Sequence, residues 1–193
     1  MKPADRRRQI LELAAELVVE QGAFPISFDL LGQRGGISKA LVYNHFPTQR
    51  DLAGALLAWR FEALAAGGLG EAIALDDPLE SACATAAIYF DETVAWGTLI
   101  HILLADLYLA RAFDPALMAR YRRWMGALAR RARADLGLGA REAVAAVQMI
   151  VAVPEEAGML VRQRRITPEN GRHVVREMTI GALEGLRPPR RAR

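Results

Sequence analysis

The segment 27–52 reads SFDLLGQRGGISKALVYNHFPTQRDL. It holds two short stretches with helical periodicity, separated by Gly35 and Gly36, and a proline follows the second stretch. Ser27 and Ser38 precede the two stretches, at the positions where N-cap side chains open a helix. Two short helices joined by a glycine turn predict a helix-turn-helix.

The second of these helices has one apolar face and one polar face. Ile37, Val42 and Phe46 recur at helical spacing and are predicted to anchor the helix inward. Gly32, midway through the first helix, lets the two helices cross closely. A helix held in this way fits the major groove of DNA, and its N-terminus offers N–H groups to phosphate. The predicted outward side chains are Lys39, Ala40, Tyr43 and Asn44.

The remainder of the chain predicts further helices and no sheet. Apolar residues repeat at a helical period from Ile10 to Val18, and no segment alternates with a period of two. Asp or Thr followed by proline marks helix starts, because proline lacks the N–H that the first turn leaves unpaired. The stretch Gly67–Gly70 predicts a joint between an N-terminal unit and a helical body. The further predicted helices span about 78–96, 98–112, 115–135, 140–165 and 168–186.

Composition places the chain among globular proteins. Of 193 residues 52% are hydrophobic, and 25 basic against 22 acidic side chains give a net charge of +3. The single cysteine, Cys83, excludes an internal disulfide and a cysteine-cluster zinc site. The sequence has no apolar run of about 18 residues and no signal-peptide pattern, so we expect a cytoplasmic protein without a membrane span.

The basic residues are nearly all arginines, since Lys2 and Lys39 are the only lysines. Two interpretations stay open at this stage. The arginines either reflect the base composition of the coding sequence, together with the many alanines, or form phosphate-binding surfaces.

The segment 143–153 is apolar on all sides, which indicates burial on more than one face. In the last predicted helix, apolar residues at helical spacing form a stripe along one face, which comprises Val175, Met178, Ala182 and Leu186. Either a partner covers one face of the 143–153 helix, or this helix lies at the centre of the helical body.

The segment 27–52 resembles the DNA-binding domain of the tetracycline-repressor (TetR) family. The matching features are the hydroxyl residue that opens the first helix, followed without a gap by Gly36-Ile37-Ser38, Val42-Tyr43, His45-Phe46 and Leu52. The resemblance implies an all-α homodimeric regulator with an N-terminal three-helix DNA-binding domain and a C-terminal helical domain. The predicted boundaries are 1–50 for the helix-turn-helix domain, a linking helix at about 48–66, 51–187 for ligand binding and dimerisation, and a basic tail at 188–193.

The resemblance also implies roles for individual residues. Tyr43 and His45 would contact phosphates, with Ser27, Ser38 and Thr48 at helix starts. Lys39, Ala40, Leu41 and Asn44 would face base edges, where lysine donates to guanine and asparagine pairs with adenine. The helices at about 140–165 and 168–186 would form the homodimer interface. The implied partners are a palindromic DNA operator and a small-molecule effector that releases it, with repression as the usual outcome.

Three departures from the family pattern bear on DNA affinity. Gln49 stands where the family usually has a phosphate-clamping lysine; its amide can still hydrogen-bond a phosphate and so contact DNA, but it releases no counterion. Gly32 and Gly35 replace the usual alanines. In the family an aromatic residue usually follows the glycine after the first helix, whereas here Ala23 takes that position and Phe24 comes one residue later. A ligand-binding dimer with decayed DNA binding is therefore the alternative function.

A regulator also needs an apolar pocket with a few polar groups. Trp96, Tyr108 and Met149 are our candidate pocket residues, because they lie mid-helix among small residues. Pro154 predicts a kink that directs Glu155 or Glu156 either into the pocket, toward a cationic ligand, or into solvent.

Nothing in the sequence indicates an enzyme. Its three histidines have no metal-ligand spacing, and there is neither a nucleophile elbow nor a phosphate loop. We therefore predict no catalytic residue, no metal site and no cofactor.

Overall fold

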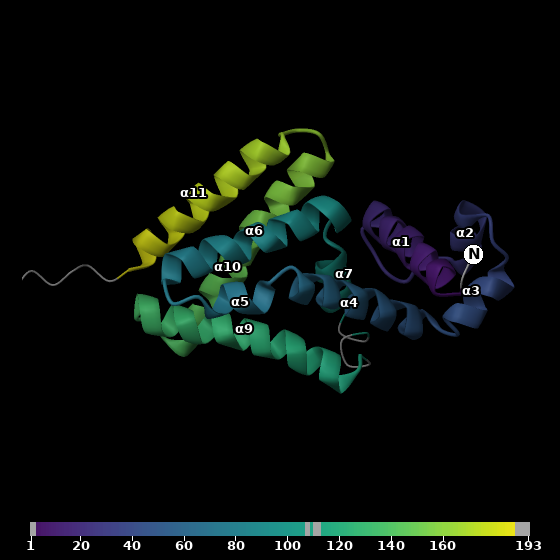
Figure 1. The fold of residues 1–193 in the computed structure, drawn as a ribbon, viewed down its shortest axis with the longest axis horizontal. Helices are drawn as coiled ribbons and strands as arrows, with labels where there is room; N and C mark the ends of the chain where they lie inside the picture. The colour runs from purple at the N-terminus through teal and green to yellow at the C-terminus, as the bar shows by residue number, and fades with distance from the viewer. Residues whose placement is uncertain (1–2, 107–108, 110–112, 188–193) are drawn as a thin grey trace, which may run out of the picture. The chain divides into compact units, whose positions relative to one another are not determined.

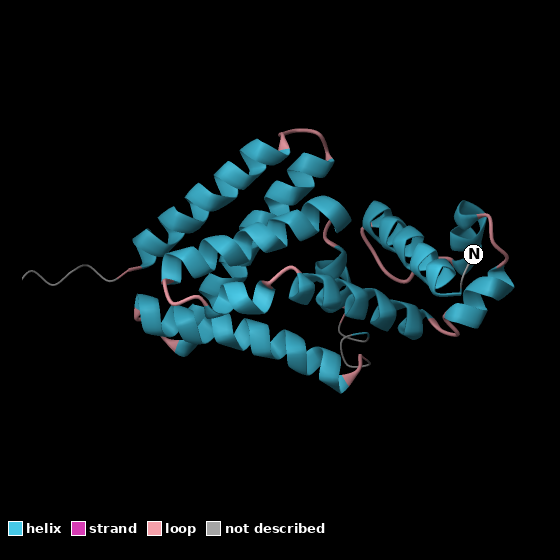
Figure 2. Cartoon of the chain, viewed as in Figure 1, coloured by secondary structure: helices cyan, strands magenta, loops and turns pink. Residues whose placement is uncertain are grey.

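The computed structural model describes residues 3–106, 109 and 113–187, and every regular element among them is a helix (Figures 1 and 2). The all-α prediction is thereby confirmed. The helices are α1 (Pro3–Gln21), α2 (Phe28–Gly35), α3 (Lys39–His45), α4 (Gln49–Ala66), α5 (Leu69–Ala74), α6 (Pro78–Trp96), α7 (Leu99–Ala105), α9 (Pro115–Leu136), α10 (Ala140–Arg162) and α11 (Pro168–Leu186).

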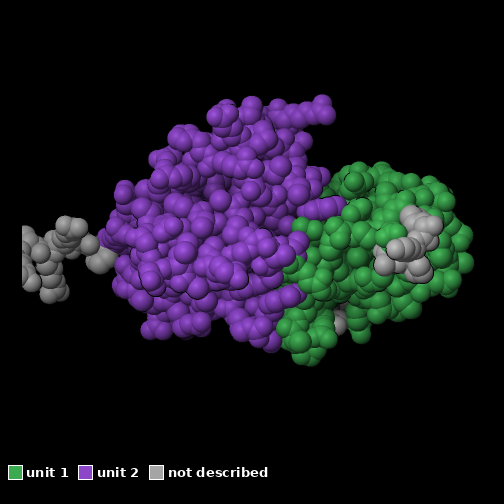
Figure 3. All heavy atoms as spheres, viewed as in Figure 1, with its two compact units in different colours: residues 1–62, 98–118 green, residues 63–97, 119–193 purple. Residues whose placement is uncertain are grey.

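The chain divides into two compact units, which Figure 3 shows in different colours. Unit 1 comprises residues 1–62 and 98–118, and unit 2 comprises residues 63–97 and 119–193. Unit 1 therefore contains more than the segment 1–50, because α7 packs against α1 within it.

In unit 1, α1 packs on α2 and α2 packs on α3. Two of the three side chains predicted to anchor α3 are in the core, since Val42 is 0% exposed and Phe46 is 1% exposed, whereas Ile37 is only half-buried. Leu52 and Leu56 on α4 are also fully buried. The buried apolar side chains of α3 and α4 fix the orientation of α3, whereas Leu30 of α2 is 37% exposed.

In unit 2, α6 packs against both α10 and α11, and these two helices also contact each other (Figure 1). Phe90 on α6 is fully buried in a cluster with Ala157 and Val175. The helices approach closely at Gly158, where an added Cβ would lie 2.6 Å from the Cβ of Thr93. A glycine is therefore required at this crossing of α10 and α6.

Arginines satisfy backbone carbonyls at the ends of two helices in unit 2. Arg162 donates to the carbonyl oxygens of Val94 and Ala95 at 3.1 and 2.8 Å, near the C-terminus of α6. Arg131 donates to the carbonyl of Ile73 and to the two carbonyls that follow α5. These carbonyls lack intrahelical donors, so the guanidinium groups act as side-chain caps. Neither interpretation of the arginines from the sequence included this role.

Several predicted boundaries and faces need correction. The expected helix at 98–112 ends at Ala105, and part of the rest lies outside the described residues, as does the tail 188–193. The helix expected to reach 165 ends at Arg162. Leu69–Ala74, within and after the glycine-rich joint, forms α5. The buried residues of α11 are Gly171, Val175, Thr179 and Leu183, which are spaced by four, whereas Met178 and Leu186 of the predicted apolar stripe are exposed in the single chain.

One described helix, α10, is long and apolar enough to cross a membrane by length and composition, with a hydropathy of 1.5 over 18 residues. Only 28% of that window is buried in the structure. A helix of this kind either crosses a bilayer or packs against another protein surface on its open side. The sequence identified the apolar segment 143–153 within α10, but it has no unbroken apolar run of about 18 residues, and so it predicted no membrane span.

Candidate nucleic-acid interface

The helix-turn-helix is built from two serine-capped helices and a glycine turn. The Ser27 hydroxyl accepts from the Leu30 N–H at 3.3 Å, and the Ser38 hydroxyl accepts from the Leu41 N–H at 3.2 Å. Both serines therefore cap helices, as the sequence predicts. Gly36, which ends α2, has a φ of 61°, a left-handed conformation that favours glycine.

The crossing of α2 and α3 depends on Gly32. The Ile37 N–H donates to the Gly32 carbonyl at 2.9 Å, and a Cβ on Gly32 would lie 2.8 Å from the Ile37 carbonyl oxygen. The obstacle is backbone, which cannot move aside as a flexible side chain can. The usual alanine of the family would therefore not fit here without a shift of the turn.

The structure exposes one face of α3. Lys39, Ala40, Tyr43 and Asn44 are exposed, whereas Leu41 and His45 are half-buried. Tyr43 is 45% exposed, and its ring packs edge-on against Phe28 with 5.0 Å between the ring centroids. This contact fixes the ring of Tyr43 in position, while a large part of the side chain stays accessible.

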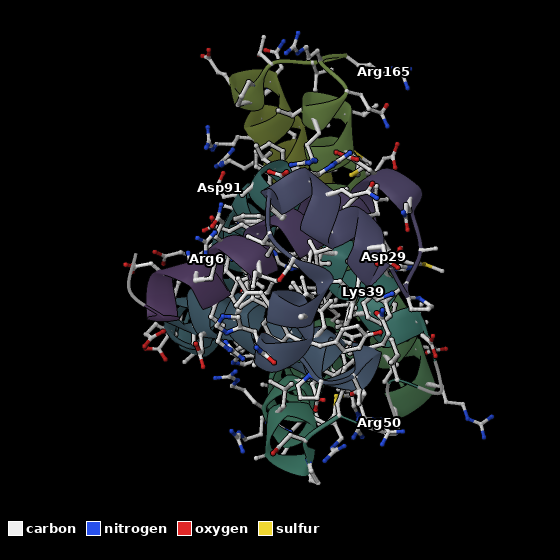
Figure 4. The ribbon with its side chains drawn as sticks, turned by 90° about the vertical axis from the view of Figure 1, so that its right-hand side faces the viewer. Arg6, Asp29, Lys39, Arg50, Asp91 and Arg165 are labelled. Atoms are coloured by element: carbon white, nitrogen blue, oxygen red, sulfur yellow. The ribbon has the colours of Figure 1, made fainter. Side chains whose placement is uncertain are left out.

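Lys39, the first residue of α3, forms an ion pair with Asp29 on α2 (Figure 4). The ammonium nitrogen lies 2.7 Å from Oδ2, and the hydrogen bond and the negative charge of Asp29 raise the pKa of Lys39. Both side chains are about half exposed, so the pair contributes little to stability. Sequence reasoning missed Asp29, because the pairing joins two helices across the turn.

The start of α4 carries a reciprocal capping box. The Thr48 hydroxyl accepts from the Asp51 N–H at 3.1 Å, and the Asp51 carboxylate accepts from the Thr48 N–H at 3.0 Å. The same hydroxyl donates to the carboxylate at 2.7 Å. Thr48 therefore opens α4 as predicted, with its hydroxyl proton directed to Asp51.

Gln49 is oriented inward. Its Nε2 donates to the Ile26 carbonyl at 2.6 Å, and its Oε1 is buried without a hydrogen-bond partner among the described residues. An acceptor oxygen cannot bind a phosphate oxygen. The side chain of Gln49 thus supports the segment before α2, and its position does not suit the phosphate contact that the sequence suggested for it.

Several other cations of unit 1 already have partners. Arg34 binds Glu20 through two 2.7 Å hydrogen bonds, and Arg8 binds Glu12 at 2.8 Å. Arg7 lies over the ring of Phe46, 5.0 Å from its centroid. Because three carboxylates offset nearby cations, the helix-turn-helix face combines hydrogen-bonding groups with a moderate positive charge.

A second candidate site is a cavity of about 90 Å³ within unit 2, between α6, α9, α10 and α11. Alanine, leucine, isoleucine and valine side chains form most of its wall. Thr85 lines it, and the Thr85 hydroxyl is buried without a hydrogen-bond partner among the described residues. Tyr89 also lines it, and burial, then the carboxylates of Glu155 and Glu92, raise the pKa of this tyrosine.

The sequence did not locate this cavity. Trp96 is half-buried and Met149 is 72% exposed, and neither lines it. Tyr108 lies outside the described residues. Glu155 is half-buried and does not line the cavity, although its hydrogen bond with Tyr89 helps to raise the pKa of that tyrosine, and Glu156 is exposed. The buried Pro154 does line the cavity.

Comparisons with known proteins agree with the geometry of the N-terminal region. Residues 10–56 match the family model described as bacterial regulatory proteins, tetR family. The HTH-type transcriptional activator FasR of Mycolicibacterium smegmatis is 35% identical over 66 residues, which is 34% of this chain and 30% of that relative. The chain thus matches less than a third of the length of this curated relative.

Solved structures extend the likeness in fold to nearly the whole chain. A TetR-like transcriptional regulator from Rhodococcus sp. RHA1 has a TM-score of 0.68 at 16% identity, covering 96% of this chain and 99% of that one. The regulator FadR from Bacillus subtilis, solved in complex with stearoyl-CoA, has a TM-score of 0.62 at 16% identity, covering 93% and 96%.

The serine-capped helices α2 and α3, joined by a glycine turn, form a helix-turn-helix with one exposed polar face. Residues 10–56 match the tetR family model, and the chain shares its fold over most of its length with solved structures of TetR-like regulators. In the part of the chain that the structure describes, no group of three or more His, Cys, Asp or Glu side chains could hold a metal ion.

Proposed function

We propose that this protein is a transcriptional regulator that binds a palindromic DNA operator as a homodimer and is released by a small-molecule effector. The observation that carries the proposal is the exposed face of α3, where polar side chains stand on a buried scaffold that matches the tetR family. We propose that Tyr43, His45 and the capped helix starts bind phosphates, while Lys39, Ala40, Leu41 and Asn44 face the bases. We propose that the protein acts in the cytoplasm, where chromosomal DNA is accessible.

We propose that two copies associate through α10 and α11. The exposed large apolar side chains of unit 2 all lie on these helices. They are Val144, Met149, Val174, Met178 and Leu186. A groove of about 670 Å³ between the helices exposes Met149 and Met178. A second copy would cover this surface, since clustered apolar side chains on a soluble domain mark an interaction site.

In this mechanism the dimer places two α3 helices about one DNA turn apart, roughly 34–36 Å. Effector binding in unit 2 favours a conformation in which this spacing no longer fits the operator. We propose repression as the outcome, because an occupied operator obstructs transcription. The relative FasR is an activator, so the direction of regulation has to be measured in a reporter assay.

The proposal is tested first by substituting Tyr43. We expect Tyr43→Phe to lower operator affinity about tenfold, because hydrogen bonds to charged groups contribute about 1.5–3 kcal/mol. The phenylalanine keeps the ring contact with Phe28, so the melting temperature should not change. The measurement is fluorescence anisotropy with duplexes selected from a random pool, at two salt concentrations.

A working regulator selects a palindrome and loses affinity as salt rises. Failure of the wild type to enrich any sequence, with and without candidate effectors, contradicts the proposal. That result would favour the alternative of a ligand-binding dimer with decayed DNA binding, to which the inward orientation of Gln49 lends some support.

A second prediction concerns Asp29, which competes with DNA for the ammonium group of Lys39. We expect Asp29→Asn to raise affinity for a scrambled duplex about threefold to tenfold, because one carboxylate near the phosphates is removed and Lys39 is released. The matched control is Glu20→Gln, which breaks the ion pair with Arg34 on the other side of α2. Equal affinities of the wild type and Asp29→Asn at low salt would contradict this role.

A further inference from the structure

Among the polar side chains in the wall of the unit 2 cavity, that of Thr85 has no hydrogen-bond partner among the described residues. The wall includes the polar side chains of Ser81, Thr85, Tyr89, Arg131 and Asp135. The Ser81 hydroxyl donates to the Ile73 carbonyl, and Tyr89 contacts Glu155. Arg131 binds three backbone carbonyls and lies 3.5 Å from the carboxylate of Asp135. Four of the five polar groups are thus already engaged with the protein.

Thr85 differs from the other two buried threonines of unit 2. Thr93 and Thr179 donate to the carbonyl four residues earlier, at 3.1 and 2.7 Å. This is the usual arrangement of a threonine inside a helix. The Thr85 hydroxyl makes no such bond, although its side chain is only 9% exposed. A buried hydroxyl without a partner destabilises the fold, so a ligand atom that bonds to it gains affinity.

The charge around the cavity disfavours ions. A carboxylate ligand would find the nearby guanidinium of Arg131 already bound to carbonyls and to Asp135. Beyond Tyr89 lie the acidic side chains of Glu92 and Glu155, which also repel an anion. An ammonium ligand would enter a largely apolar space that neither Glu92 nor Glu155 lines. In the cavity wall an anion would meet only Arg131, and a cation only Asp135, and these two side chains already pair with each other at 3.5 Å, so either ion loses its hydration for a partner that is already engaged.

The volume limits the size of the ligand. The cavity measures about 90 Å³, whereas an engineered apolar cavity of about 150 Å³ takes benzene. A long acyl chain, such as that of the stearoyl-CoA held by FadR, needs a much larger space. The structure therefore favours a compact ligand.

We propose that the effector is a small, uncharged, mostly apolar molecule with one hydroxyl or carbonyl group that hydrogen-bonds to Thr85. This inference rests on the proposed function, since it names the ligand class of the regulator's effector site. It also distinguishes this protein from the acyl-CoA-bound neighbour of the same fold.

The test compares 1-butanol with butyrate, n-butylammonium and 1-chlorobutane, by NMR titration of the full-length protein without DNA. We expect 1-butanol to bind at least tenfold more tightly than either ion. In Thr85→Val, a change that removes the hydroxyl and keeps the shape, affinity for 1-butanol should fall about tenfold. Affinity for 1-chlorobutane, which has the same number of heavy atoms and no hydroxyl, should stay the same or rise.

The control is Thr179→Val, which removes a buried hydroxyl on α11 that does not line the cavity and should leave 1-butanol affinity unchanged. Tighter binding of an ion, equal 1-butanol affinity in Thr85→Val, or no binding of any of the four compounds overturns the inference. Because these titrations contain no DNA, they are independent of operator binding. Loss of operator binding alone would overturn the proposed function and leave the ligand assignment standing.

Discussion

Met178→Glu, in the exposed apolar groove between α10 and α11, is expected to prevent the proposed dimer from forming and to lower operator affinity more than 100-fold. Met178 is 53% exposed in the single chain and would be covered by the second copy. Burying a carboxylate without a partner costs several kcal/mol, and each tenfold loss of affinity corresponds to about 1.4 kcal/mol. Light scattering coupled to gel filtration measures the mass, and anisotropy measures DNA binding.

The control is Arg133→Glu, which changes the charge on an exposed position of α9 and should leave the dimer intact. Because α10 also has the length and hydropathy of a membrane-spanning helix, lipid is the competing occupant of this face. Flotation with phosphatidylcholine and phosphatidylglycerol vesicles distinguishes lipid binding from dimerisation. A wild type that is monomeric at micromolar concentration and floats with the vesicles would contradict dimerisation through α10 and α11.

Gly158→Ala is expected to lower the free energy of unfolding by about 1–3 kcal/mol, the usual range for overpacking a well-filled core. The added methyl group would lie 2.6 and 2.7 Å from two carbons of Thr93, so α6 and α10 must move apart. For a chain of this length we expect the melting temperature to fall by roughly 2–10 °C. Differential scanning calorimetry measures the change.

Gly54→Ala is the matched control, since this glycine lies inside α4 and an added Cβ has open space around it. Alanine is the better helix former by about 1 kcal/mol, so this variant should be more stable than the wild type. A Gly158→Ala protein that melts at or above the wild-type temperature would show that the crossing of α6 and α10 tolerates a side chain.

Local signals predicted the elements well wherever one residue type determines a helix end. Asp77 accepts from the Glu80 N–H at 2.7 Å and Thr167 from the Asn170 N–H at 3.2 Å, and both precede a proline, as the sequence suggested. The helix α5 was missed because its glycine-rich start reads as a break. Its last carbonyls are held by Arg131, more than fifty residues away, which no local pattern encodes.

The candidate sites were predictable to different extents. The exposed face of α3 follows from one short amphipathic segment, so the sequence predicted its residues. The partners of Lys39 and Gln49 come from other segments of the chain, so the sequence did not predict them. The cavity was missed because its position depends on how four helices pack together. The pocket residues predicted from the sequence have large side chains, whereas the cavity lies where small residues such as Ala82 and Ala86 leave space between the helices.

The turn between α2 and α3 is closed by backbone atoms of Gly32 and Ile37, and the helix is anchored by buried side chains on its other face. The exposed positions Ala40 and Asn44 take no part in either contact. If α3 reads bases as proposed, substitutions at these two positions should change the DNA sequence preference while the scaffold stays unchanged. We expect libraries randomised at positions 40 and 44 to yield folded proteins with new operator preferences.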